Sequence, residues 1–403
     1  YSMSQSFEQR RGQKSVDEWA SDVSLILDGN TNEGIRASAP GRVEFIGNHT
    51  DYNGGWVLGA TIDRRVEVVL QRRSDRQIRL QSEAAVPPVE VPLGSVERQS
   101  GEWAWANYIL GMVEVLQGEG MTMESGFDLR VGSTLPVGAG LSSSAALELA
   151  SGAALSEAYG GEFLRRDLVR MAQRAENEFV GVPCGLLDQA VVALGGADRL
   201  VRLDARSEAT AAVPFPPETG IWIFRTHQAH ALSESGYQER HDEARAVRER
   251  LRELLGNEEA EYLVDVSPSQ LEEVKRELSK TLYRRARHVV TEHRRTQRVV
   301  QLLKAGRRSA AGRLLFASHE SSRVDYENST EALDFVVDRL AEQEGVLGAR
   351  LTGAGFGGAA MAWTRAGYGE EQAHEVAGAY ADRFGTELET LACRPAPGLY
   401  VWA

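Results

Sequence analysis

The stretch LPVGAGLSSSAALELASGAAL, residues 135–155, contains the strongest structural pattern in this chain of 403 residues. Alternating apolar residues at Phe127, Leu129 and Val131 predict a strand before it, and the run rich in alanine and leucine predicts a helix after it. Small residues between the two allow the backbone to turn so that several amide N–H groups point the same way. Together with the partial positive charge of a helix N-terminus, such a loop forms an anion site suited to phosphates.

Three consecutive serines, Ser142 to Ser144, add hydroxyl groups that can reach phosphate oxygens or a metal ion. A glycine turn followed by a serine N-cap would also explain the pattern, but a cap needs only one serine. We therefore favour a phosphate loop. It is not a Walker loop, because no lysine lies near a glycine loop of the required form. The lysines are Lys14, Lys275, Lys280 and Lys304.

Upstream of this loop, the stretch GRVEFIGNHTDYNGG at residues 41–55 combines four kinds of polar side chain between glycines. They belong to Arg42, Asn48, His49 and Asp51. The Asn-Gly dipeptide within the stretch is a strong turn pattern, which predicts a strand followed by a turn. A capped turn would account for the polar residues as structural ones. A cation, an amide, an imidazole and a carboxylate this close together would equally suit a site that grips a small polyhydroxylated molecule, and this stretch alone leaves both interpretations open.

The stretch AENEFVGVPCGLLDQAVVALGG, residues 175–196, carries two further candidates. Asp188 lies among apolar and small residues, where an unpaired carboxylate is costly. It either caps a helix or serves in chemistry, because a carboxylate close to Arg42 could accept a proton while the arginine stabilises its charge. Glu176, on the preceding helical stretch, is a candidate oxygen ligand for Mg²⁺.

A G-x-G-x-x-G spacing at Gly353, Gly355 and Gly358 formally matches a dinucleotide-binding loop. The residues after it, AAMAWT, predict a strand, whereas a dinucleotide-binding loop leads into a helix. We therefore do not expect a dinucleotide fold.

The composition is that of an ordinary globular protein, with 42% hydrophobic and 26% charged residues. No apolar run reaches 18 residues, and the polar N-terminal stretch lacks the apolar middle of a signal peptide. Two cysteines, Cys184 and Cys393, provide neither a disulfide framework nor a zinc spacing. We therefore expect a cytoplasmic protein with no membrane segment.

The net charge of −13 argues against broad nucleic-acid binding. The basic stretch at residues 284–308 runs against that balance. Its valines and leucines occur among the arginines in a helical pattern, so we expect the arginines to form the solvated face of a helix. We accordingly expect no nucleic-acid partner, and a monomer or weak homo-oligomer.

Strands and helices are mixed along the chain without regular βαβ alternation, which favours the α+β class. A helix is expected at residues 15–29, strands over about residues 35–80, and a return to strand in AVVALGGADRLVRLD at residues 190–204. The prolines of FPPETG, residues 215–220, mark the best candidate boundary between two halves. The expected domains are residues 15–212 and residues 213–403.

Together these stretches resemble the galactokinases, a family in the superfamily that also holds homoserine, mevalonate and phosphomevalonate kinases. The sugar-binding signature of that family is roughly GRVNLIGEHTDYN, and this chain has GRVEFIGNHTDYN. The family's phosphate loop is roughly PLGAGLSSSA, and here it is PVGAGLSSSA. GVPCGLLDQ and LTGAGFGG match the catalytic segment and the C-terminal glycine motif, and the resemblance extends from about Ala39 to Gly358. It implies a two-domain α+β kinase fold with the active site between the domains.

The resemblance also implies roles for matching residues. Asp188 would be the base that takes the proton from the anomeric hydroxyl of a sugar, and Arg42 its electrostatic partner. Trp105 would pack against the adenine of ATP. The sugar would be held by Asn48, His49, Thr50, Asp51, Gly185 and Tyr237. The ATP phosphates would be held by Gly138, Ala139, Gly140, Leu141, Ser142, Ser143 and Ser144, and Mg²⁺ by Ser144 and Glu176.

Two departures from the family pattern concern the sugar. Asn48 stands where the signature has a sugar-contacting glutamate, and Arg225 where the segment before Tyr237 usually has asparagine. The kinase residues are intact, so the resemblance implies an ATP- and Mg²⁺-dependent kinase that makes galactose 1-phosphate. One alternative is the same chemistry on another sugar, such as N-acetylgalactosamine, a modified galactose or a pentose. The other is a galactokinase-like sensor that binds sugar and ATP without turnover.

Overall fold

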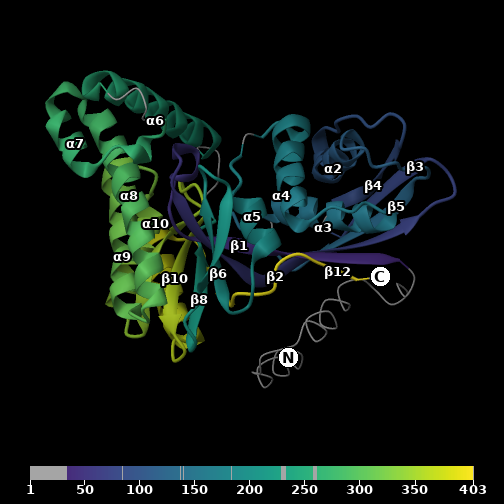
Figure 1. The fold of residues 1–403 in the computed structure, drawn as a ribbon. Coiled ribbons are helices and arrows are strands. Elements are labelled where there is room, and N and C mark those ends of the chain that lie inside the picture. Colours follow the sequence, from purple (N-terminus) through teal and green to yellow (C-terminus); the bar gives the residue numbers. More distant parts are fainter. Residues whose placement is uncertain are drawn as a thin grey trace.

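The computed structural model describes residues 34–402 except 84, 137, 139, 183, 228–232 and 257–260. The helix expected at residues 15–29 and the loop residue Ala139 therefore lie outside the described residues. In Figure 1 the helices α2 (Asn107–Gly118), α3 (Ser143–Ala158) and α4 (Arg165–Arg174) gather at one end of the molecule. Helices α8 (Lys280–Lys304), α9 (Arg308–Ser321) and α10 (Glu331–Glu342) gather at the other.

The first sheet belongs mainly to the N-terminal half. Within the described residues it has eight strands, and its main path runs in the order β12-β1-β2-β5-β3-β4. The long strand β2 pairs with β5 through its C-terminal half and with β6 through its N-terminal half, and β7 follows β6. The strands are β1 (Ile35–Ile46), β2 (Trp56–Arg72), β3 (Gln77–Ser82), β4 (Ala85–Pro92), β5 (Phe127–Ser133), β6 (Arg199–Asp204), β7 (Ala209–Pro214) and β12 (Tyr400–Trp402).

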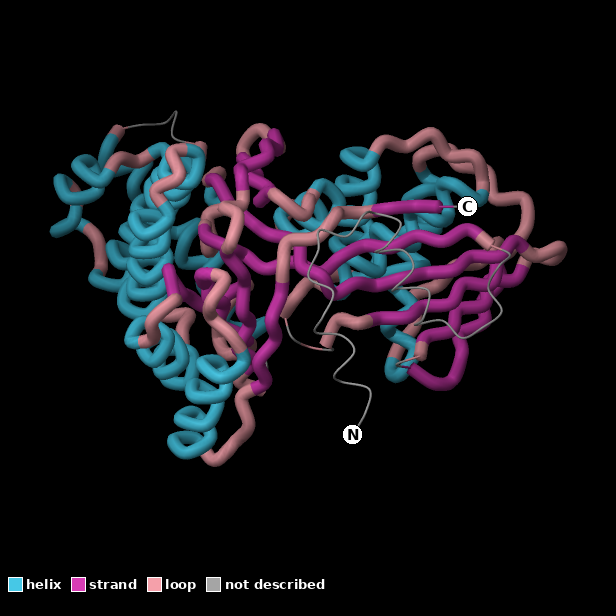
Figure 2. The backbone as a smooth tube through the Cα atoms, turned by 90° about the horizontal axis from the view of Figure 1, so that it is seen from below, coloured by secondary structure: helices cyan, strands magenta, loops and turns pink. Residues whose placement is uncertain are grey.

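The second sheet belongs to the C-terminal half and is antiparallel throughout its described pairs, in the order β11-β8-β10-β9. Figure 2 shows the strands of both sheets between the two groups of helices. The chain leaves the first sheet at Pro214 and enters the second at Thr219, and β12 later returns it to the first. The strands are β8 (Thr219–Arg225), β9 (Val346–Thr352), β10 (Ala359–Arg365) and β11 (Glu389–Cys393).

Helices cover both sheets, which makes this an α+β protein as expected. Besides those named above, the described helices are α5 (Leu187–Leu194), α6 (Ser233–Leu255), α7 (Pro268–Glu273) and α11 (Glu370–Phe384). The short 3₁₀ and π turns are η1 (Asp51–Asn53), η2 (Gly101–Ala106), η3 (Ala175–Val180), η5 (Leu263–Asp265), η6 (Lys275–Glu277) and η7 (Ser322–Tyr326). No helix in the described part of the chain combines the length and the apolar composition needed to cross a membrane.

Alternation along the second sheet divides its side chains between two hydrophobic cores. Ile221 and Ile223 of β8 belong to the large core shared with the first sheet, whereas Trp222 and Phe224 face the core under α10 and α11. Successive residues of a strand point to opposite faces, so one apolar strand can serve both cores. The large core is therefore shared by both sheets, whereas the core under α10 and α11 belongs to the second sheet.

Two expectations about local structure were wrong. Residues 190–194, expected as strand, form the end of helix α5, because Val191 and Val192 are fully buried among its neighbours and tertiary packing outweighs their strand preference. Most of the basic stretch at 284–308 lies in helix α8, which ends at Lys304, but it is not simply solvated. Arg285 is buried and pairs with Glu243 at 2.6 Å.

A buried ion pair joins the two sheets. Arg350 on β9 is fully buried, and its Nη1 donates to Glu44 Oε1 on β1 at 2.9 Å. The backbone N–H of Glu44 donates to Thr352 Oγ1 at 2.9 Å. Burial raises the pKa of Glu44 to about 7, although Arg350 and Arg42 act in the opposite direction. These contacts hold the end of β1 against β9, just before the turn that carries Asn48, His49 and Asp51.

Candidate active site

The centre of the site is an ion pair between β1 and the first turn of α5. Arg42 donates from Nε to Asp188 Oδ1 and from Nη2 to Oδ2, each at 2.7 Å. The two residues are 146 positions apart, and Arg42 is almost buried while Asp188 is partly exposed. This bidentate geometry is the strong form of an arginine–carboxylate contact. It holds one partly exposed carboxylate in a fixed orientation.

The glycine loop lies directly against this pair. Arg42 Nη1 donates to the carbonyl of Gly140 at 2.7 Å, and its backbone N–H donates to the carbonyl of Leu141 at 3.0 Å. Gly138 and Gly140 both have φ of +67°, a conformation that favours glycine. The loop feeds helix α3, which begins at Ser143. The loop's conformation therefore suits the anion site that its sequence predicts.

Ser142 has a role that the sequence did not indicate. It occupies the N-cap position of α3 with φ of +59°, and its side chain makes no capping hydrogen bond. Its Oγ donates instead to Asp188 Oδ2 at 2.5 Å. Oδ2 thus accepts two hydrogen bonds and Oδ1 accepts one. Because each carboxylate oxygen has two lone pairs, Oδ1 keeps one for a further proton or donor.

Asp51 and Gly185 meet on the other side of Asp188. A Cβ atom on Gly185 would lie 2.5 Å from Asp51 Oδ2, so a larger residue at this position would require the Asp51 side chain to move. Burial raises the pKa of Asp51 to about 6, and the nearby charge of Asp188 acts in the same direction. Burial also raises the pKa of Tyr237, and the nearby charge of Asp51 adds to the rise. The structure therefore brings Asp51, Gly185, Tyr237 and Asp188 together.

Asn48 and Thr50, expected at the sugar, have side chains that are bound within the protein. Asn48 Nδ2 donates to the carbonyl of Gly353 at 2.8 Å, and its Oδ1 accepts from Asn328 Nδ2 at 2.7 Å. Thr50 Oγ1 donates to the carbonyls of Gly47 and Trp56. Both residues are buried. Their side chains hold the turn against neighbouring segments, and direct contact with a sugar stays a prediction.

His49 also has protein partners on both ring nitrogens. Nε2 lies 3.0 Å from the carbonyl of Ala354 and must donate to it, so Nδ1 accepts from the hydroxyl of Tyr52 at 2.9 Å. The Tyr52 hydroxyl in turn lies 2.7 Å from that of Tyr326. Burial lowers the pKa of His49 to about 3. The imidazole is neutral and held in one tautomer, with its ring 5.5 Å from that of Tyr237.

Replacing His49 with glutamine is expected to make the free energy of unfolding fall less as pH is lowered below neutrality. The native pKa of about 3 lies below the ordinary 6.5, so the unfolded chain binds more protons between these values and stability falls as pH is lowered. Glutamine can keep a donor toward Ala354 but does not titrate. Between pH 7 and pH 5, the free energy of unfolding of wild type should fall by on the order of 2 kcal/mol more than that of His49→Gln, as measured by urea unfolding. Equal losses in the two proteins would contradict a buried neutral imidazole.

Glu176 lies at the start of the π turn η3, next to the phosphate loop. Gln189 Nε2 donates to Glu176 Oε2 at 2.7 Å, and Ser144 also hydrogen-bonds the carboxyl group. Burial raises the pKa of Glu176, and the charge of Asp188 adds to the effect. Among the described residues no group of three or more histidine, cysteine or acidic side chains could hold a metal ion. Ser144 and Glu176 could supply only two hard oxygen ligands, which fits Mg²⁺ that keeps waters and phosphate oxygens as its other ligands.

Trp105 lies in η2, partly buried against the large core. Its indole N–H is buried and has no hydrogen-bond partner among the described residues. Its role at an adenine stays a prediction.

Comparison with known proteins agrees over nearly the whole chain. Residues 29–72 match the galactokinase galactose-binding signature, residues 107–196 the GHMP kinases N terminal domain, and residues 299–382 the GHMP kinases C terminal domain. The galactokinase of Roseiflexus sp. (strain RS-1) is 39% identical over 361 residues, which are 90% of this chain and 91% of that protein. The galactokinase of Thermococcus kodakarensis is 39% identical over 367 residues, which are 91% of this chain and 100% of that protein. The chain belongs to the galactokinase family.

Solved structures agree with this galactokinase assignment. The crystal structure of Lactococcus lactis galactokinase complexed with galactose superposes with a TM-score of 0.86 at 33% identity, covering 94% of this chain and 98% of the other. A mevalonate kinase structure, at 16% identity and a TM-score of 0.62, shares the fold. The expected superfamily and fold are therefore confirmed.

Within this galactokinase site, sequence reasoning missed two supporting residues. Gln189 follows the expected base Asp188 directly and orients Glu176, the expected metal ligand, so its position in the motif was an available clue. Asn328 holds Asn48 from a segment 280 positions away, and no local pattern indicates that contact.

The hydroxyl of Ser142 can be tested against the strain at its backbone. Ser142→Ala removes the donor to Asp188 and leaves a β-carbon at positive φ, whereas Ser142→Gly removes the donor and relieves the strain. A hydrogen bond to a charged group contributes about 1.5–3 kcal/mol, so both variants should lose roughly 10–100-fold in kcat. Steady-state kinetics at saturating substrates measures the loss. Full activity in Ser142→Gly would show that the hydroxyl does not act on Asp188.

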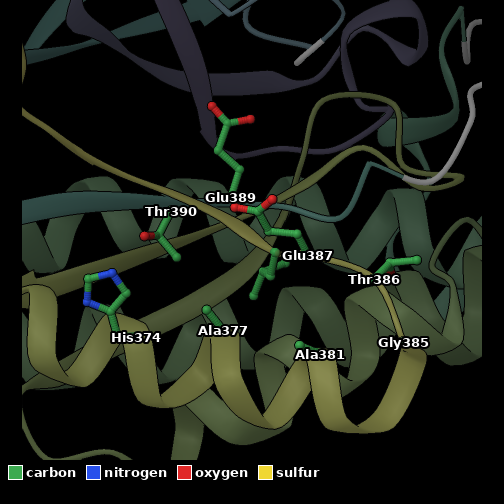
Figure 3. A pocket seen from close by; sticks show the side chains of 9 residues that line it. His374, Ala377, Ala381, Gly385, Thr386, Glu387, Glu389 and Thr390 are labelled. Atoms are coloured by element: carbon green, nitrogen blue, oxygen red, sulfur yellow. The ribbon is translucent and has the colours of Figure 1, made fainter.

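A separate open groove of about 540 Å³ lies between α11 and the segment leading into β11. Figure 3 shows it lined by His374, Ala377 and Ala381 of the helix and by Thr386 to Thr390 of the strand side. None of the residues assigned to the site lines this groove, so it is not the catalytic cleft.

Proposed function

We propose that this protein transfers the γ-phosphoryl group of ATP to the anomeric hydroxyl of galactose, giving galactose 1-phosphate and ADP. The observation that carries the proposal is the bidentate pair of Arg42 and Asp188, which contacts the glycine loop through Gly140 and Ser142. The galactokinase relatives and the galactose-complexed structure of one of them support galactose as the substrate.

The geometry indicates how the base would work. Oδ1 of Asp188 has the lone pair that Ser142 and Arg42 leave available, so it would accept the proton of the anomeric hydroxyl. That oxygen forms its bond to the γ-phosphorus while the bond from this phosphorus to the β–γ bridging oxygen breaks and ADP leaves. Arg42 keeps the carboxylate oriented, and general base catalysis of this kind is typically worth ~10²–10⁴-fold.

The glycine loop would hold the phosphates through backbone N–H groups from Gly138 to Ser144 and the N-terminus of α3. Ser144 and Glu176 would hold Mg²⁺, since they offer a hydroxyl and a buried carboxyl group beside the loop. When bound, the ion would neutralise phosphate charge. Gln189 would keep Glu176 turned toward that position.

Two broader assignments belong to the same proposal. We place the domains at residues 15–212 and 213–403, supported by the passage from the first sheet to the second between Pro214 and Thr219. The return of β12 to the first sheet means that the C-terminal segment would complete the N-terminal domain. We place the reaction in the cytoplasm, where ATP is available and free cysteines such as Cys184 and Cys393 stay reduced.

The test is ADP release over a panel of free sugars, with the product examined by ³¹P NMR. We expect turnover with galactose, phosphate on the anomeric oxygen, loss of activity on chelation with EDTA, and recovery on addition of Mg²⁺. Turnover with another sugar and none with galactose would identify that other sugar as the substrate. Binding of sugar and ATP without turnover on any sugar would identify a sensor instead of an enzyme.

A further inference from the structure

The C-terminal end of β8 carries an arginine beside the glycine loop. A Cβ atom placed on Gly138 would lie 3.7 Å from Arg225 Nη2, so the guanidinium lies close to the loop. The Arg225 side chain is only 17% exposed. A largely desolvated cation therefore lies at the loop that the proposed function assigns to the ATP phosphates.

Glu389 of β11 holds this arginine in place. The two residues are register partners in neighbouring strands, and Arg225 Nη1 lies 3.0 Å from Glu389 Oε2. His227 Nε2 lies 3.3 Å from the same oxygen. In Figure 3 the Glu389 side chain extends away from helix α11. Glu389 thus anchors one end of the guanidinium, while Nη2 is the atom that approaches Gly138.

The other positive groups that contact the loop are engaged or weak. Arg42 directs Nε and Nη2 to Asp188 and Nη1 to the carbonyl of Gly140. The N-terminus of α3 contributes only about half a positive charge. A guanidinium suits phosphate oxygens better than other cations because its planar donors match them in pairs.

We propose that Arg225 binds the β- and γ-phosphates of ATP through the guanidinium group that lies near Gly138. This inference rests on the proposed function, since it needs ATP at the glycine loop. It adds a contact that the family pattern does not predict, because the family usually has asparagine at this position.

Binding of ATP and AMP to the full-length protein, measured by isothermal titration calorimetry with Mg²⁺ present, tests the proposal. Arg225→Asn should weaken ATP by roughly 10–100-fold, the range of a lost hydrogen bond to a charged group, and leave AMP within twofold of wild type. Glu389→Gln keeps the cation, so its ATP affinity should stay within threefold. Arg365→Asn, at the opposite end of the same sheet and exposed, is the matched control and should change neither.

The glutamate variant separates binding from simple strand pairing. Both Arg225→Asn and Glu389→Gln break the cross-strand ion pair, so equal loss of ATP affinity in the two would overturn the proposal. ATP affinity within twofold of wild type in Arg225→Asn, or an equal loss of AMP, would also overturn it. Thermal unfolding checks that each variant is folded, and Arg225→Gln replaces the asparagine variant if that one is not. No ATP binding by wild type would instead overturn the proposed function.

Discussion

Asp188→Asn is expected to lower kcat by ~10²–10⁴-fold while leaving the affinities for sugar and ATP within a few-fold of wild type. Asparagine keeps the shape and can still accept from Arg42 through one oxygen. It is uncharged, and its nitrogen lone pair is delocalised into the amide, so it cannot take the proton that Oδ1 of the carboxylate would accept. The loss should therefore appear in the chemical step.

Pre-steady-state quench kinetics with saturating ATP and galactose measures that step directly. Asp198→Asn, an exposed aspartate near the start of β6, is the matched control and should keep the wild-type rate. Retention of more than about a tenth of the wild-type rate by Asp188→Asn would contradict its role as base. A loss of sugar binding equal to the loss of rate would assign Asp188 to binding instead.

Arg350→Met is expected to destabilise the folded protein by about 3–5 kcal/mol, because it leaves the carboxyl group of Glu44 buried without its partner. Methionine has a similar linear shape, so the loss comes mainly from the uncompensated carboxylate. For a domain of ordinary size this is a large part of the total stability. Urea unfolding followed by tryptophan fluorescence measures it.

The loss should depend on pH in a direction that the pKa of Glu44 determines. In wild type this pKa is about 7, above its ordinary value of 4.5, and loss of Arg350 raises it further. The folded variant then binds a proton that the unfolded chain has released, so its stability falls as pH rises from about 4.5 through neutrality. Its deficit relative to wild type should be larger at pH 8 than at pH 5.5.

The double variant Glu44→Gln/Arg350→Met is the control, since it removes the buried charge altogether. At pH 8 its free energy of unfolding should be at least about 1 kcal/mol higher than that of Arg350→Met. The difference between the double variant and wild type should change little with pH. A double variant no more stable than the single one would show that Arg350 acts through packing and its bond to Ser318 rather than through Glu44.

Local patterns were sufficient for much of the fold and for several site residues. The strand–glycine loop–helix order around Gly138 and Gly140, the strand and turn before Asp51, and the absence of a helix after Gly358 all follow from the preferences of neighbouring residues. Backbone conformation at glycine, serine and asparagine depends mostly on adjacent groups, which explains why the order of elements can be predicted. The valines of α5 were the exception, because their burial outweighed their own preference for a strand.

The contacts that form the site join residues that are far apart in the sequence. Arg42 and Asp188 are 146 positions apart, Ser142 and Asp188 46, and Asn48 and Asn328 280. The family resemblance implied the first pair, but it did not indicate that Ser142 donates to the base, that both nitrogens of His49 have protein partners, or that the amide of Asn48 is bound by Gly353 and Asn328.

The sequence by itself determined most of the segments that form strands, helices and glycine loops, with residues 190–194 as the exception, and the residue types at their ends. Only the tertiary structure decided which of these side chains gather around Asp188 and which hold the turn in place. The physical reason is that a buried polar atom must find a partner within the protein, and that partner depends on how the two sheets pack. The buried pair of Glu44 and Arg350 joins β1 to β9, and this junction lies next to the turn from Asn48 to Asp51.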